Sequence, residues 1–188
     1  MVKNYTEVLY DNQLINTERL IIRKFRKEDV ANVLAYGSDP EVLEYLIWDG
    51  IKTLDEAMTS IVEYYWSKPS NFAIELKENS KCIGGIGLRI KPEHEKASFG
   101  YVLNRFYWGK GYMTEALTAM LHLCFDKLEL NRVEGGHFVG NEGSGMVMKK
   151  SGMLLEGMSP QSEKVKGVFR DLVHYGITKE HWDSQIKV

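Results

Sequence analysis

The chain has 188 residues, of which 44% are hydrophobic and 27% are charged, so residues 1–188 can bury the core of a single domain. A net charge of −2 and a sequence pI of about 6.2 argue against a surface devoted to nucleic acid. No apolar signal region begins the chain, and no apolar stretch approaches the ~20 residues of a membrane helix. We therefore expect a cytoplasmic protein without nucleic-acid or membrane partners.

The first elements follow an N-terminal extension at residues 1–16. Residues 17–25 alternate in the manner of a strand, with apolar side chains facing the core. We expect its basic residues, Arg19, Arg23 and Lys24, to face solvent. The sequence therefore predicts one half-buried strand here.

Helix patterns come next, at residues 27–36, 40–46 and 54–67. Asp39 stands immediately before a proline, which is a typical cap and first position of a helix. Thr53 begins the third helix with a glutamate three residues later, as in a capping box.

The rest of the chain reads as strands with two longer helices. Short polar turns between its first three strands favour antiparallel pairing. A polar stretch at 157–167 separates the last two strands. The expected ranges are strands at 71–77, 81–91, 96–103, 131–139, 153–155 and 168–178, and helices at 112–128 and 141–151. The order of elements indicates a mixed α/β fold.

The turn Gly109-Lys110-Gly111 joins a predicted strand to the helix that begins near Tyr112. Two glycines before a helix leave bare backbone N–H groups at its positive end, and such a turn binds phosphate. Two common phosphate motifs fail. A P-loop needs glycine at 104 and Ser or Thr at 111, which are Asn104 and Gly111, and a dinucleotide fingerprint needs glycine at 114, which is Thr114.

A second motif lies one strand downstream, with spaced residues Asn141, Ser144, Val147, Lys150 and Gly152. Taken with Trp108-Gly-Lys-Gly-Tyr-Met-Thr-Glu-Ala116 and Thr17-Glu-Arg-Leu-Ile-Ile-Arg23, it resembles the GNAT superfamily of acyl-CoA-dependent N-acyltransferases. Within that superfamily it is similar to bacterial ribosomal-protein alanine/serine N-terminal acetyltransferases. The resemblance spans about residues 17–180, and Phe106 departs from the Gln or Arg that usually opens the phosphate turn.

The resemblance implies a GNAT fold of the α/β (α+β) class. It has a mixed, mostly antiparallel sheet of about seven strands and about four helices, with a splay between residues 97–103 and 131–139. The implied cofactor is acetyl-CoA, and a backbone N–H of 102–103 would polarise its thioester carbonyl. The implied cofactor contacts are Val102, Leu103, Gly109, Lys110, Gly111, Tyr112, Met113, Thr114, Asn141 and Ser144.

Asn141 and Ser144 are also the implied catalytic residues. Many family members carry a tyrosine, at the position of Met148 here, that protonates the leaving thiolate, so the resemblance implies Ser144 as a substitute acid. Each residue has a plainer interpretation, because Asn141 suits a helix cap and Ser144 a first helical turn. Lys110 is either a point charge for the pyrophosphate or a solvated turn lysine.

A general base is less evident. Glu95 is either a solvated turn residue or a base acting through water. Asp171 is either structural, bonding a backbone group or a tyrosine hydroxyl, or faces the substrate. Cys82 and Cys124 lie in apolar runs and are expected to be buried free thiols, which disfavours a thiol relay. The five histidines show no metal-ligand spacing, so no metal site is predicted.

The acceptor pocket is expected from the helices of residues 38–68 and the tail 157–172. Aromatic residues there, which either pack or line the pocket, are Tyr45, Trp48, Tyr64, Tyr65 and Trp66. The resulting hypothesis is an N-acetyltransferase that uses acetyl-CoA directly, with a protein or peptide N-terminal amine as acceptor. The alternatives are a small-molecule amine acetyltransferase for a polyamine, amino acid or antibiotic, and a catalytically weak acyl-CoA-binding module. The protein is expected to be a monomer or homodimer.

Overall fold

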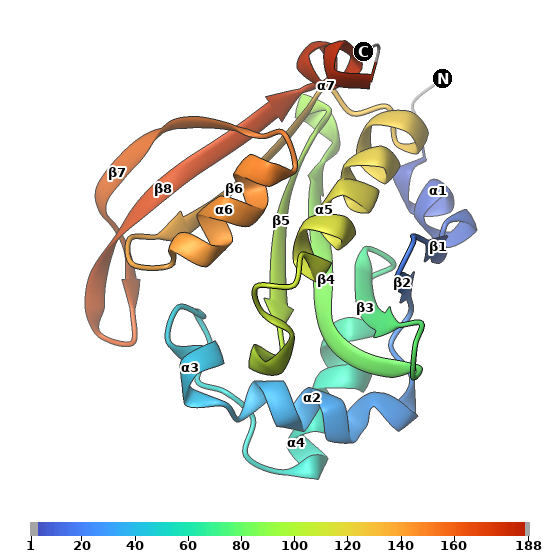
Figure 1. The fold of residues 1–188 in the computed structure, drawn as a ribbon, viewed down its shortest axis with the longest axis vertical. Helices are drawn as coiled ribbons and strands as arrows, with labels where there is room; N and C mark the ends of the chain where they lie inside the picture. The colour runs from blue at the N-terminus through green and yellow to red at the C-terminus, as the bar shows by residue number, and fades with distance from the viewer. Residues whose placement is uncertain (1–3, 187–188) are drawn as a thin grey trace.

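The computed structural model describes residues 4–186 and contains one sheet of eight strands in the order β1-β2-β3-β4-β5-β6-β8-β7 (Figure 1). The strands are β1 (Leu14–Asn16), β2 (Leu20–Arg23), β3 (Asn71–Leu76), β4 (Lys81–Lys91), β5 (Lys96–Leu103), β6 (Arg132–Phe138), β7 (Leu154–Val165) and β8 (Val168–Thr178). The α-helices are α1 (Tyr5–Asp11), α2 (Val30–Gly37), α3 (Pro40–Leu43), α4 (Leu54–Thr59), α5 (Tyr112–His122), α6 (Glu142–Lys150) and α7 (Lys179–Ile186). Short 3-10 and π segments extend them, at Lys27–Asp29, Ser60–Tyr65, Pro92–His94, Arg105–Tyr107 and Leu123–Lys127.

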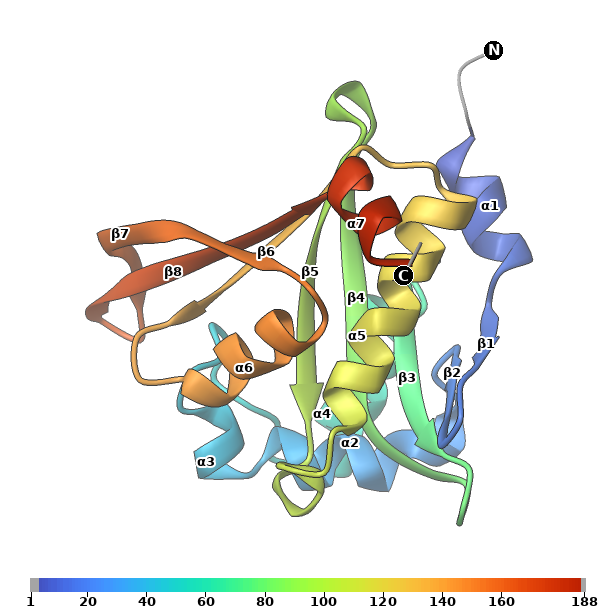
Figure 2. The ribbon, with the colours of Figure 1, turned by 45° about the horizontal axis from the view of Figure 1, so that its top comes forward.

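The sheet divides between β5 and β6, which form its parallel pair. They are in register only from Lys96 opposite Arg132 to Ser98 opposite Glu134, and all other neighbouring strands run antiparallel. Beyond Ser98 the two strands diverge, and Figure 2 shows β6, β8 and β7 leaning away from β5 and β4. The predicted splay is therefore present, and it exposes the edge of β5 to a gap in the sheet.

Helices cover both faces of the sheet, and strand alternation explains why. In β3, Phe72 and Ile74 point into a core shared with α5 and α6, while Ala73 points into a second core shared with α2 and α4 (Figure 1). The larger core contains Leu117, Leu121 and Phe125, all fully buried. Both faces of the central strands are apolar because both are covered.

Most predicted elements are confirmed, with local signals acting as expected. Asp39 accepts from the Glu41 amide and Thr53 from the Glu56 amide, so both predicted caps are present. Gly152 has a φ of +86° just after α6, as a helix end requires. The sheet has eight strands instead of about seven because β1, in the extension expected at 1–16, pairs with β2. The stretch 157–167, expected as a separator, mostly belongs to β7.

The expectation that Arg23 faces solvent is wrong. Its side chain is 5% exposed, with Nη1 2.8 Å from Asp29 Oδ2 and Nε 2.5 Å from Glu75 Oε2. The outward-looking face of β2 is covered by the segment that leads into α2, and that segment carries Asp29. The second layer of helices therefore turns an apparent surface charge into a buried ion-pair network.

Candidate active site

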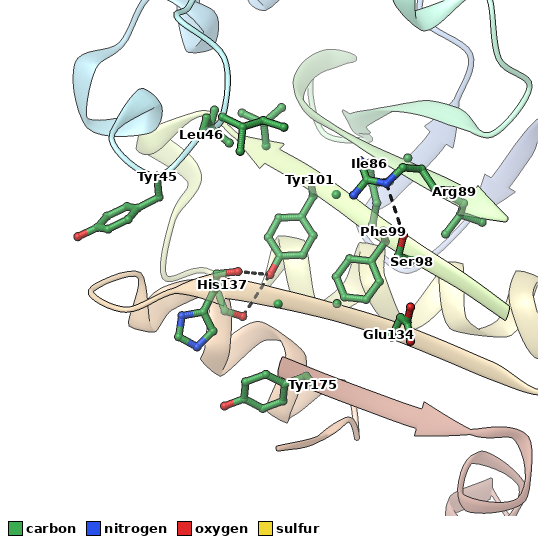
Figure 3. A pocket seen from close by; sticks show the side chains of 18 of the residues that line it. Tyr45, Leu46, Ile86, Arg89, Ser98, Phe99, Tyr101, Glu134, His137 and Tyr175 are labelled. Atoms are coloured by element: carbon green, nitrogen blue, oxygen red, sulfur yellow. Dashed lines mark hydrogen bonds between the residues drawn. The ribbon is translucent and has the colours of Figure 1, made fainter. Parts of the chain in front are cut away.

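A cleft of about 1160 Å³ opens where β5 and β6 separate. Its walls come from β4, β5, β6, β8, the start of α6 and the segment after α3 (Figure 3). It exceeds the ~300–1,000 Å³ of ordinary small-molecule sites, so it has room for more than one substrate. Of the cofactor contacts implied from sequence, Val102, Asn141 and Ser144 line it.

The free edge of β5 presents backbone groups to this gap. The Asn104 amide donates to the Ile83 carbonyl at 2.8 Å, in the same register that pairs Val102 with Gly85. Because hydrogen-bonded residues alternate in an antiparallel ladder, the Val102 amide faces β4, while those of Tyr101 and Leu103 face the side that β6 has left. This geometry supports a backbone role for Leu103 and does not support one for Val102, whose side chain lines the cleft instead.

The turn before α5 has the shape that the sequence predicts. Gly109 has a φ of +72° and Gly111 one of +81°, a left-handed conformation that glycine adopts without strain. The first internal bond of α5 runs from the Glu115 amide to the Gly111 carbonyl, so the amides of residues 112–114 have no helical partner. Apart from its chain neighbours, no atom of residues 4–186 lies within 4 Å of a Cβ built on Gly109. The turn is thus an open set of N–H donors at a helix N-terminus, which fits a pyrophosphate.

Arg19, from the opening motif, and Glu115, in the first turn of α5, brace this turn. The Glu115 carboxylate accepts from the Thr17 hydroxyl at 2.6 Å, the Arg19 amide at 2.8 Å and Arg19 Nε at 2.7 Å. Arg19 Nη1 in turn donates to the Lys110 carbonyl at 3.0 Å, and its guanidinium lies 4.6 Å from the Tyr112 ring centre. The Thr17–Arg23 motif and the Gly109–Gly111 turn therefore form one connected unit.

This brace predicts a pH dependence of stability. Burial raises the pKa of Glu115, but hydrogen bonds from Thr17 and Arg19 outweigh it, so the pKa lies below its usual 4.5. A depressed pKa contributes stability above pH 4.5 that is lost as the pH falls through the folded-state value. We expect wild type to lose more unfolding free energy than Glu115→Gln between about pH 5 and pH 3 in urea titrations.

The exposed neighbour Glu18 supplies the control for that experiment, since Glu18→Gln should leave the wild-type pH slope unchanged. Equal slopes for wild type and Glu115→Gln would contradict the role given to the Thr17 and Arg19 hydrogen bonds.

On the other side of the cleft, Asn141 is the N-terminal cap of α6 and Ser144 lies in its first turn. Asn141 Oδ1 accepts from the Ser144 amide at 3.3 Å, so Asn141 is the helix cap of its plainer interpretation. Ser144 Oγ lies 2.8 Å from the Tyr101 hydroxyl, which also donates to the Ser144 carbonyl at 3.1 Å (Figure 3). Met148 is fully buried in the core and supplies no polar group. Sequence reasoning missed Tyr101, because its partner lies 43 residues away.

Two residues suggested as general bases, Glu95 and Asp171, are not among the residues that line the cleft. Glu95 is an exposed turn residue with a φ of +46°, and it is not among the residues that line the cleft. Asp171 Oδ1 accepts from the Gln161 amide at 2.8 Å, across the irregular part of the β7–β8 pair. The structural interpretation of Asp171, as a partner of a backbone group, is therefore confirmed.

Three other carboxylates do line the cleft. Glu134 accepts from Lys96 Nζ at 2.9 Å and Arg132 Nε at 3.3 Å. Burial raises the pKa of Glu134, but the hydrogen bonds and charges of Lys96 and Arg132 lower it by more, so the pKa lies below its ordinary value. Glu156 is ion-paired with Arg132. Glu163 has no ion pair among residues 4–186, and the cleft also contains His174, whose Nε2 lies 2.8 Å from Ser159 Oγ.

The expected acceptor-side aromatics divide between lining and packing. Tyr45, Trp48, Tyr64 and Tyr65 line the cleft, whereas Trp66 does not, and its indole donates to the Phe25 carbonyl at 2.8 Å. The β7–β8 hairpin reaches the same region, because Lys166 Nζ donates to the Leu43 carbonyl at 2.7 Å. The segment after α3 and this hairpin thus meet beside the cleft.

The remaining sequence expectations concern thiols and Lys110. Cys82 and Cys124 are buried free thiols, and burial raises the pKa of each to about 12. Both therefore stay protonated at neutral pH and make poor nucleophiles. Lys110 is exposed, with Nζ 5.6 Å from the Tyr107 ring centre. Within residues 4–186, no group of three His, Cys, Asp or Glu side chains is arranged for a metal, and no helix has the length and apolarity to span a membrane.

The splayed sheet, the glycine turn at a helix N-terminus and the exposed strand edge are the features expected of an acyl-CoA-dependent acyltransferase. The model of the acetyltransferase (GNAT) domain matches residues 19–154, and the chain belongs to that family. It is 30% identical over 175 residues to the uncharacterized N-acetyltransferase p20 of Bacillus licheniformis, covering 90% of this chain and 98% of that protein.

Two further relatives agree with this assignment. A GNAT-family acetyltransferase from Bacillus anthracis superposes with a TM-score of 0.81 at 29% identity, over 89% of this chain and 99% of that one. The ribosomal protein uS5 alanine N-acetyltransferase of Escherichia coli is 29% identical over 180 residues, covering 89% of this chain and 92% of that protein. The protein is an acetyltransferase, and acetyl-CoA is its acyl donor.

Proposed function

We propose that this enzyme acetylates the N-terminal α-amine of a protein or peptide. The observation that carries the proposal is the cleft between β5 and β6, which joins the free strand edge to a wide acceptor side. The similarity of this chain to the uS5 alanine N-acetyltransferase, over 89% of this chain and 92% of that protein, supports a protein acceptor.

The acid–base character of the cleft supports an α-amine over a lysine or polyamine. The acceptor must be neutral to attack, and an α-amine has a pKa near ~7.7–8 against ~10.4 for a lysine. Glu134 and Glu156 are both paired with cations, and the cations beside Glu134 lower its pKa, so Glu134 is not suited to accept a proton near pH 7. Glu163 and His174 also line the cleft and are the candidate proton acceptors. An α-amine needs less help from such a base than a lysine does, because more of it is already neutral near pH 7.

Acetyl-CoA supplies the acetyl group as a thioester. In the proposed arrangement, the amides of residues 111–114 and the Gly109–Lys110 turn hold its pyrophosphate, and Arg19 keeps that turn in place. The Leu103 N–H, on the free edge of β5, donates to the thioester oxygen, where negative charge develops. The acceptor nitrogen bonds to the acetyl carbon as the carbon–sulfur bond breaks, so nitrogen loses one proton and sulfur gains one.

Asn141 and Ser144 complete the donor side of this arrangement. Asn141 fixes the first turn of α6 through the Ser144 amide, which holds Ser144 at the cleft wall. The Ser144 hydroxyl then donates toward the sulfur as it leaves. Met148 adds nothing to the chemistry, because it lies wholly in the core.

A thiol-release assay tests this function. Purified protein and acetyl-CoA are mixed with peptides that have free N-termini, with the same peptides blocked at the N-terminus, and with free polyamines, amino acids and aminoglycosides. We expect release with unblocked peptides. Release only with free amines would favour the small-molecule alternative, and no release despite CoA binding would favour the weak binding module.

A further inference from the structure

Tyr101 links β5 to the first turn of α6 beside the proposed reaction site. It projects from β5 toward α6, where its hydroxyl meets Ser144 Oγ at 2.8 Å and the Ser144 carbonyl at 3.1 Å (Figure 3). Its ring stacks on Phe99, with centroids 5.8 Å apart and planes inclined by 13°. The phenol is thus held between a neighbouring ring and the first turn of α6.

The hydroxyls of Tyr101 and Ser144 can bond to each other in two ways, with either one as the donor. When Tyr101 donates to the Ser144 carbonyl, the Ser144 proton points back to the Tyr101 oxygen. When Tyr101 donates to Ser144 Oγ instead, the Ser144 proton is free for a third group in the cleft. Only the rotation of two hydroxyls separates these arrangements, and no heavy atom has to move.

The phenol remains a donor throughout the working pH range. Burial raises the pKa of Tyr101 to about 12, and the hydrogen bond to Ser144 offsets only part of that shift. A neutral Tyr101 therefore always has a proton to give to Ser144 Oγ. Ser144 also lies in the first turn of α6, where the helix dipole favours nearby negative charge.

We propose that Tyr101 is a positioning residue for the leaving group, since its hydroxyl donates to Ser144 Oγ and so directs the Ser144 proton to the sulfur of CoA. This inference rests on the proposed function and adds a residue to it. It assigns Tyr101 no proton transfer of its own. The purpose of the pair is to hold one hydrogen-bond donor at the position where the sulfur becomes negative.

Binding of CoA and of desulfo-CoA, which lacks only the sulfur, tests the proposal without turnover. Calorimetry at about pH 9, where a large share of ordinary thiols is ionised, gives the ratio of the two dissociation constants. Hydrogen bonds to charged groups are worth enough that Tyr101→Phe should reduce the preference for CoA by about 10-fold or more. Ser144→Ala should reduce it equally, and the double variant no further, because the two hydroxyls act as one unit.

Tyr175→Phe is the matched control, because it removes a phenol hydroxyl from the same cleft without a bond to Ser144. It should leave the preference for CoA unchanged. In turnover, Tyr101→Phe should lower kcat about tenfold and change the KM for acetyl-CoA by less than about twofold. Phenylalanine keeps the stacking on Phe99, and Ser144→Ala provides an independent variant if Tyr101→Phe folds poorly.

Three results would overturn the inference. If Tyr101→Phe weakened the binding of CoA and of desulfo-CoA equally, Tyr101 would be only a structural link between β5 and α6. Additive losses in the double variant would make the two hydroxyls independent, and unchanged binding of both ligands in Tyr101→Phe would remove the residue from the site. The proposed function fails separately, if wild type binds CoA but releases no thiol with any acceptor.

Discussion

Replacing Arg23 with leucine is expected to lower the free energy of unfolding by about 3–5 kcal/mol. Asp29 and Glu75 would then stay buried without their shared cation, at 5% side-chain exposure each. An unpaired buried charge costs far more than the loss of a surface ion pair. Chemical denaturation, with the slope against denaturant compared between variants, measures the effect.

Arg26→Leu is the control for that experiment. Arg26 also contacts Glu75, at 3.4 Å, but its side chain is 57% exposed. Water screens such a pair, so we expect a change of about 1 kcal/mol or less. Similar losses in the two variants would contradict the view that the Arg23 network is buried.

Gly111→Val is expected to raise the KM for acetyl-CoA at least about tenfold. A β-branched residue at a φ of +81° costs on the order of 1–3 kcal/mol, and relief of that strain turns the amides that follow it away from their common direction. The new side chain would also approach Arg19 Nη2, which lies 3.3 Å from a Cβ built at this position. Steady-state kinetics and calorimetry with CoA report the same loss of donor affinity.

Gly167→Val separates this effect from backbone strain in general. Gly167 has a φ of +84° in the β7–β8 turn, and within the described residues only its chain neighbours come within 4 Å of a Cβ built there. Its substitution should reduce stability and leave donor affinity intact. If both variants weaken CoA alike, or if neither does, the pyrophosphate does not bind at the Gly109–Gly111 turn.

The strands of the central sheet were predicted well because short turns and alternating apolar residues can be read from neighbouring positions in the sequence. The turns between β3, β4 and β5 are short, and their strands alternate clearly between two covered faces. The caps at Asp39 and Thr53 bond within three residues, so propensity alone is enough. By contrast, α1 and β1 depend on distant contacts, such as the bond from Gln13 to the Pro69 carbonyl at 2.9 Å.

The local geometry of the candidate site was predicted where its motifs are contiguous, and it was missed where partners meet only in the folded chain. The glycine turn is readable because three adjacent residues carry it. Arg23 appeared solvated because nothing in its own strand indicates that Asp29 and Glu75 converge on it. Tyr101 resembled one more core residue of an alternating strand, and only the folded chain brings Ser144, in the first turn of α6, to its hydroxyl.

The most direct measurement uses one peptide that has a free N-terminus and an internal lysine. After incubation with enzyme and acetyl-CoA at about pH 7.5, fragmentation mass spectrometry locates the acetyl group. We predict acetylation of the α-amine alone, because its pKa near ~7.7–8 leaves a useful neutral fraction where the lysine has almost none. Acetylation of the lysine, or transfer only to free small amines, would contradict the proposal of an N-terminal acetyltransferase.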